Sequence, residues 1–231
     1  MHSKLARAAS KELMDRWRDH DAVVANRSPF GRTENGQHDL RGITFRNKTL
    51  KSLGLFDIDF SSADLDNLWI EDCVFDECRF DRAILTQLGV RGGRFNNCSF
   101  RKSDMRASFI GYHGTEINHC TFDGVRLART SFRNAIFTGI KFRGREWSNI
   151  EFCPSGFWDC AFSGVFKGCM FFGDYRLPDD LVKYGPARRT GFHNVSLEEV
   201  EFRWTGFKGN WVFDAIVLPR DGMRFCARRV I

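Results

Sequence analysis

From Leu40 to Ile110 every fifth residue carries a large apolar side chain, without a gap. A second series with the same spacing begins at Tyr112, two residues out of phase, and continues to Phe162. A period of five matches neither the 3.6-residue period of an amphipathic helix nor the two-residue alternation of a half-buried strand. The chain therefore predicts a repeated unit of five residues, and this repeat constrains the fold more than any local propensity does.

Each unit has one large residue, which we call the centre, and a small or β-branched residue two positions before it. The two residues after the centre are mostly polar, charged or glycine. Short extended pieces with a turn every five residues can wind into a coil whose turns stack about 4.8 Å apart, the spacing of paired strands. We expect the centres to form the core, and phenylalanine supplies many of them: Phe60, Phe75, Phe80, Phe95, Phe100, Phe122, Phe132, Phe137, Phe142 and Phe152.

Units such as residues 63–67 (ADLDN) and 98–102 (CSFRK) resemble the pentapeptide-repeat family, whose loose motif is A(D/N)LXX with Leu or Phe in the middle. The resemblance covers roughly residues 38 to 172. It implies an all-β fold, a right-handed four-sided parallel β-helix in which four units, about twenty residues, complete each coil.

The repeat is irregular in three places. Its phase moves by two residues at 111–114, which predicts a small bulge at a corner of the coil. Arg145 stands at an inward position, and because a buried unpaired guanidinium is costly, we expect the backbone to bulge outward there. The repeat lapses over 173–189, where Pro178 and Gly185 predict a short helix, and then resumes in phase at Phe192.

These boundaries predict four parts. They are an N-terminal helical cap over 1–37, the pentapeptide-repeat β-helix over 38–172, a helical insertion loop over 173–189, and a final coil with a C-terminal cap over 190–231. Caps are expected because each end of a β-helix exposes unpaired strands and core. A homodimer formed through one terminal cap is the alternative use of such an end.

The sequence indicates a cytoplasmic protein that does not cross a membrane. No apolar segment has the length of a signal-peptide core or of a membrane span. Five of the eight cysteines lie two residues before a centre, the place of a small inward side chain, and no CxxC pair occurs. We therefore expect reduced thiols that pack as small hydrophobic groups, rather than disulfides or metal ligands.

No catalytic signature is present. The chain has no GxSxG, Walker loop, HExxH or strand-associated GxGxxG, and its six histidines are scattered. We therefore predict no catalytic residues, no metal site, no cofactor and no enzymatic activity.

Charge is unevenly distributed along the chain, whose net charge is +6. Nine acidic residues and one arginine lie between Asp57 and Asp81, whereas nine basic and three acidic residues lie between Arg101 and Arg145. Residues about twenty apart should stack on one face, and two such columns mix the two signs. They are Ser61, Asp81, Arg101, Asp123, Arg143 and Ser163, and Lys51, Glu71, Arg91, Gly111 and Arg133. We therefore expect the acidic residues to form a ring around one coil, with opposite charges pairing between coils.

The main hypothesis is a protein-binding scaffold, a resistance or toxin-immunity factor whose protein partner is a toxin or a topoisomerase. The resemblance implies one alternative, because some members of the family protect DNA gyrase or topoisomerase by imitating duplex DNA. Direct binding of nucleic acid through the basic surface is the second alternative, and it is less favoured because no basic motif interleaved with aromatic residues appears.

The candidate partner-binding residues belong to the acidic ring, to the exposed-looking tryptophans and to the insertion. They are Asp66, Glu71, Asp72, Asp76, Glu77, Trp69, Trp158, Tyr175, Lys183 and Tyr184. Phe56, Trp204 and Trp211 are further aromatic side chains expected at the surface.

Overall fold

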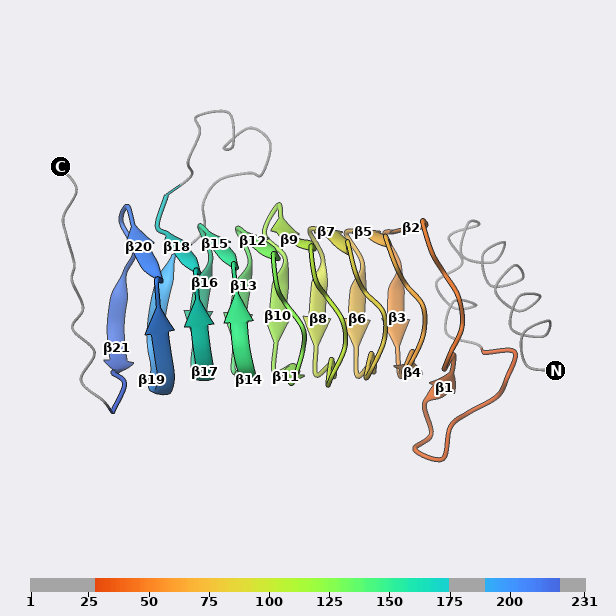
Figure 1. Cartoon of the computed structure of the whole chain (residues 1–231). Coiled ribbons are helices and arrows are strands. Elements are labelled where there is room, and N and C mark those ends of the chain that lie inside the picture. Colours follow the sequence, from red (N-terminus) through yellow and green to blue (C-terminus); the bar gives the residue numbers. More distant parts are fainter. Residues whose placement is uncertain (1–27, 175–189, 221–231) are drawn as a thin grey trace.

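The computed structural model describes residues 28–174 and 190–220. This part of the chain is all-β and winds into a solenoid of parallel strands that stack along one axis, from β1 at one end to β21 at the other (Figure 1). Four ladders of strands and bridges run along the axis, and we name them faces 1 to 4 in the order in which each coil visits them. The predicted all-β, four-sided parallel fold is confirmed, whereas the N-terminal helical cap and the helix of the insertion lie outside the described residues.

Faces 1 and 2 consist of short strands. Face 1 holds β2 (Thr49–Lys51), β5 (Trp69–Glu71), β7 (Gly89–Arg91), β9 (Phe109–Tyr112), β12 (Ser131–Arg133), β15 (Glu151–Cys153), β18 (Met170–Phe172) and β20 (Gly206–Lys208). Face 2 holds β3 (Gly54–Phe56), β6 (Val74–Asp76), β8 (Arg94–Asn96), β10 (Glu116–Asn118), β13 (Ile136–Thr138), β16 (Gly156–Trp158), the start of β19 (Gly191–Arg203) and β21 (Phe213–Val217).

Faces 3 and 4 combine strands with isolated bridges. Face 3 holds β1 (His38–Asp39), β4 (Ile58–Asp59), β11 (Thr121–Asp123) and the first parts of β14 (Lys141–Ser148) and β17 (Ala161–Lys167). Face 4 begins as single bridges between residues such as Asp64 and Ile84, and continues in the second parts of β14, β17 and β19. β14 and β17 turn the corner from face 3 to face 4, and β19 runs from face 2 through both, so that faces 2, 3 and 4 form one sheet.

The register follows the five-residue period. Phe75 pairs with Phe95, twenty residues later, and Phe95 pairs with Ile117, twenty-two residues later across the phase shift. Corners are turned by residues in the left-handed conformation, such as Asn67 with a φ of 53° and Gln87 with a φ of 58°. Asparagine and glycine tolerate this conformation best, which explains why polar residues and glycine follow each centre.

Two predicted irregularities are bulges. At the phase shift the amide of Gly114 donates to the carbonyl of Gly111 over 3.0 Å, and Arg91 pairs with Tyr112. The predicted stacking of Gly111 on Arg91 is therefore wrong, because the extra residues enter face 1 already at Gly111. The register also shifts between Arg143 and Glu146, which leaves the Arg145 side chain exposed, as expected from the cost of burying it.

The core is a set of aromatic stacks parallel to the axis. On face 3, the rings of Phe80 and Phe100 are parallel within 5° at a centroid distance of 5.0 Å, and Phe122 lies 5.0 Å beyond Phe100. Rings on neighbouring faces meet edge to face, as Phe95 does with Phe100 at 5.8 Å. Both arrangements are favourable for aromatic quadrupoles. Buried at this core are Phe60, Phe75, Phe80, Phe95, Phe100, Phe122, Phe132, Phe137, Phe142 and Phe152.

The described cysteines are reduced and buried. Cys98 and Cys120 lie on face 3 at the inward position before their centres, and the Cys160 thiol donates to the carbonyl of Phe137. Burial raises the pKa of Cys160 to about 12 and that of Cys169 to about 11. These thiols are therefore core-filling groups with little thiolate character at neutral pH.

We expect Cys73, Cys160 and Cys169 to resist alkylation in the native protein and to react fully in guanidinium, with mass spectrometry identifying the labelled peptides. Stability should also fall with rising pH. Unfolded thiols lose their protons above a pKa of 9.0, whereas the folded Cys160 keeps its proton up to about pH 12, so ionisation favours the unfolded state between these values. Rapid native alkylation of Cys160 at pH 8 would contradict its buried placement.

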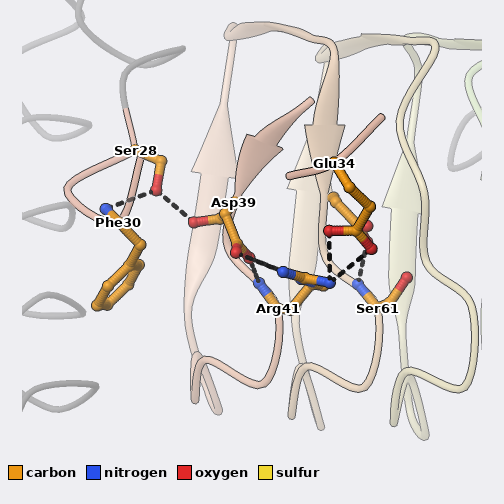
Figure 2. Close-up of polar contacts among 7 residues, drawn as sticks. Ser28, Phe30, Glu34, Asp39, Arg41 and Ser61 are labelled. Atoms are coloured by element: carbon orange, nitrogen blue, oxygen red, sulfur yellow. Dashed lines mark hydrogen bonds and ion pairs between the residues drawn. The ribbon is translucent and has the colours of Figure 1, made fainter. Parts of the chain in front are cut away.

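Polar contacts connect the residues at the start of the described chain, from Ser28 to Arg41 (Figure 2). The Ser28 hydroxyl donates to the carbonyl of Asp39 and accepts the amide of Phe30. The Arg41 guanidinium bonds both carboxylate oxygens of Asp39, at 3.0 and 2.8 Å, and lies 3.3 Å from Glu34. These hydrogen bonds hold the pKa of Asp39 below its usual value.

At the other end, β21 adds one more parallel strand beside β19. Trp211, which precedes β21, is 7% exposed and packs edge to face against Phe171 and Phe192 at centroid distances of 5.1 and 5.2 Å. The expectation that Trp211 lies at the surface is wrong, because the corner it occupies folds inward over the last phenylalanines. Trp204 does lie at the surface, with 82% of its area exposed.

Candidate partner-binding surface

The structure does not bring the predicted partner-binding residues into one site. Asp66 and Trp69 lie on either side of the corner between faces 4 and 1, and Glu71 lies on face 1, 3.4 Å from Lys51. Asp72, Asp76 and Glu77 follow around the same coil toward and beyond face 2. The acidic residues thus surround one coil rather than follow the axis. Tyr175, Lys183 and Tyr184 lie outside the described residues.

Trp158 lies on face 2, further along the axis, and is half-buried. Its indole stacks on the His193 ring at 4.7 Å with an angle of 7°, and His193 lies 3.5 Å from Asp214. Trp158 therefore joins β16 to β19 as a surface stack, at a distance from Trp69.

Opposite charges pair between coils. Arg94 on β8 lies 2.8 Å from Glu116 on β10, and Arg126 lies 3.2 Å from Asp104 of the preceding coil. Burial acts to raise the pKa of Asp104, but hydrogen bonds from Arg106 and the charge of Arg126 bring the net pKa below its usual value. Such exposed pairs contribute about 0–1 kcal/mol each, so they favour the register more than they stabilise the fold.

Face 1 carries two exposed aromatic rings. Trp69, Gly89 and Phe109 are consecutive partners on β5, β7 and β9, and their side-chain positions all point outward. The indole of Trp69 lies across Gly89, where an added Cβ would come within 2.6 Å of the ring. Trp69 is 40% exposed and Phe109 is 46% exposed. We call Trp69, Gly89 and Phe109 the aromatic patch.

Polar and basic residues of the neighbouring corner border the aromatic patch and enclose a shallow depression of about 560 Å³. Besides Trp69 and Phe109, its lining residues are Asn67, Thr86, Gln87, Arg106, Ala107 and Arg129. Arg106 bonds Asp104 at 2.7 and 2.8 Å, while Arg129 forms no ion pair with any residue of 28–174 and 190–220. An aromatic surface beside guanidinium groups is the composition typical of protein-binding hot spots.

The sequence indicated Trp69 and Asp66 but missed Gly89, Phe109, Arg106 and Arg129. The available signal was positional, since residues 69, 89 and 109 each precede a centre by one residue and lie twenty apart. Glycine at the middle position of that column, between two aromatic residues, indicates that one ring lies over the backbone of the next coil.

A second depression, of about 610 Å³, lies at the corner between faces 3 and 4. Three of its arginines have carboxylate partners, since Arg41 pairs with Asp39 and Glu34, Arg79 lies 3.8 Å from Asp81, and Arg101 lies 3.7 Å from Asp123. Across residues 28–174 and 190–220, no three His, Cys, Asp or Glu side chains gather closely enough to hold a metal ion. The same part of the chain contains no helix with the length and apolar character needed to cross a membrane.

Comparison with known proteins gives one family and several structures. A family model for pentapeptide repeats matches residues 113–144, in eight copies. A trypsin-treated variant of QnrB1, a plasmid-mediated fluoroquinolone resistance protein, is 18% identical, covers 76% of this chain and 92% of its own, and has a TM-score of 0.43. HetL, a pentapeptide repeat protein involved in heterocyst differentiation regulation from the cyanobacterium Nostoc sp. strain PCC 7120, is 13% identical, covers 82% of this chain and 88% of its own, and has a TM-score of 0.27. No curated protein matches the sequence.

Proposed function

We propose that this chain, which carries pentapeptide repeats, is a non-enzymatic scaffold that binds a protein partner through the side of its solenoid. The observation that carries this proposal is the aromatic patch, where Trp69 and Phe109 expose 40% and 46% of their areas beside Arg106 and Arg129. A core of stacked rings cannot adjust to a ligand, so binding energy has to come from side chains outside it. Large exposed aromatic groups are costly to leave in water unless a partner covers them.

The DNA-mimicking alternative receives no support from the described surface. Duplex DNA carries one phosphate charge about every 1.7 Å along its axis, so an imitator needs carboxylates along one side over many coils. Here the acidic residues encircle one coil, and several of the described carboxylates bind arginine or lysine of a neighbouring coil, as Asp64 does with Arg46 at 2.6 Å. The partner that we propose is a toxin or a topoisomerase, contacted through the aromatic patch. The proposed role is resistance or immunity in the cytoplasm.

The proposal is tested by purification of the full-length chain from its host cells, with and without nuclease. We expect one protein to co-purify in both preparations and to form a stoichiometric complex when the two purified components are mixed. Loss of the partner after nuclease treatment, or no retained protein, would refute a protein-binding role. A supercoiling assay with a topoisomerase poison separates the partner classes, because a topoisomerase protector restores supercoiling at stoichiometric amounts and a toxin-binding protein does not.

A further inference from the structure

We propose that the aromatic patch is the docking site for a protein segment that presents one large apolar side chain followed by carboxylates. This inference rests on the proposed function and specifies the surface and the chemistry of the partner.

The shape of the patch favours a single apolar side chain. The strands that carry Trp69 and Phe109 are two strand spacings apart, about 9–10 Å, with Gly89 between them. Because Gly89 has no side chain, the Trp69 indole lies flat on the β7 backbone and turns its other face outward. Trp69 and Phe109 both line the depression, with the indole over Gly89 between their strands, and this suits one aromatic or branched aliphatic group.

The β9 side of the patch carries a guanidinium group without an ion pair among the described residues. On the side of β9, the neighbouring corner carries Arg106 and Arg129, and Arg129 has no ion-pair partner among the described residues. On the side of β5, the coil that carries Trp69 also carries Asp66, whose carboxylate accepts from the Thr86 hydroxyl, and Glu71, which pairs with Lys51 at 3.4 Å. Carboxylates of a bound segment would therefore lie toward Arg129, and this polarity fixes the direction in which the segment lies.

The same polarity argues against single-stranded nucleic acid, although nucleic-acid bases also stack on tryptophan. A phosphate backbone that crossed the patch would carry negative charge past Asp66 and Glu71 as well as past the arginines. A protein segment can place carboxylates on one side only, and it is therefore the occupant that the charges favour.

The test uses the full-length chain and a phage-displayed library of random twelve-residue peptides. We expect selected peptides to share a Trp, Phe or Leu with Asp or Glu on one side of it. Synthetic copies of these peptides should bind at least about tenfold more weakly to Phe109→Ser and to Arg129→Ala, a loss of about 1.4 kcal/mol or more. Gly89→Ala keeps every contacting side chain but displaces the indole, so it should weaken binding similarly.

Matched controls lie on other faces. Phe56→Ser replaces a ring of similar exposure (44%) on face 2, and Arg82→Ala removes an arginine at the corner between faces 3 and 4. Both should bind the peptides as the wild type does, and circular dichroism and the urea midpoint should confirm that every variant is folded. Peptides that bind all three patch variants with wild-type affinity, or a selection with no apolar-acidic consensus, would overturn the inference.

A labelled twenty-nucleotide oligothymidylate is the second probe. Tight binding that is lost in Phe109→Ser would overturn the inference in favour of a nucleic-acid site, whereas no binding at 50 mM salt supports it. Failure of the proposed function has a different signature, the absence of any co-purifying protein. If the partner from cells binds the patch variants normally, only the present inference fails.

Discussion

Replacing Phe100 by alanine should lower the free energy of unfolding by about 3–5 kcal/mol. Phe100 is 3% exposed and stacks between Phe80 and Phe122, with each ring 5.0 Å from the next. Its removal leaves a cavity that neighbouring strands cannot close, because backbone hydrogen bonds at 2.6–2.9 Å fix the coil spacing on both sides. Urea denaturation followed by circular dichroism would measure the loss.

Phe100→Leu is the matched control and should cost clearly less, because leucine fills part of the same space. Agreement between circular dichroism and tryptophan fluorescence is needed, since a solenoid can unfold in segments rather than in one step. A change of less than about 1 kcal/mol for the alanine variant would mean that Phe100 does not face the core.

Replacing Gly164 by alanine should also destabilise the solenoid strongly. The φ of Gly164 is +105°, outside the range that side-chain-bearing residues adopt readily, and its added Cβ would lie 2.1 Å from the carbonyl oxygen of Gly144. The conformation alone costs about 1–3 kcal/mol, and the overlap adds to it because the contacting atom belongs to backbone. The thermal midpoint and the urea midpoint should both fall.

Gly42→Ala separates the two causes. Gly42 also has a positive φ, +67°, but nothing lies within 4 Å of its added Cβ. Alanine there should cost about 1–2 kcal/mol, from conformation only. Equal losses for the two variants would show that the close approach of Gly144 to Gly164 does not exist in solution.

Much of the fold follows from the sequence because one five-residue period determines both the core and the register. Phe75 and Phe95 are centres twenty residues apart, and they face each other across β6 and β8. The outward displacement of Arg145 was predictable for a different reason, the cost of burying a charge. Trp211 shows the limit of this reasoning. Its burial depends on how the last corner folds over Phe171 and Phe192, and no period indicates that.

The candidate site was only partly predictable. Trp69 was chosen as an exposed aromatic residue, but the position of its ring depends on Gly89, and the depression depends on arginines that enter from the adjoining corner. Trp69 and Arg129 line the same depression but lie sixty residues apart in the sequence. The charge columns indicated which residues share a face, but not which guanidinium groups already had partners.

At the corner between β18 and β19, extra residues between coils cost little free energy. Ordinary contacts between coils join residues twenty apart, as between Asn47 and Asn67, whereas Asp159 and Asn194, across the insertion, are 35 apart. Enlarging a closed loop by this ratio costs only about 0.5 kcal/mol in chain entropy. The amide of Gly191 still donates to Ser155 over 3.0 Å, so the following coil keeps its register. A peptide epitope grafted beside Asp174 would therefore lengthen this corner at a similarly small cost in chain entropy and would be displayed on a rigid rod.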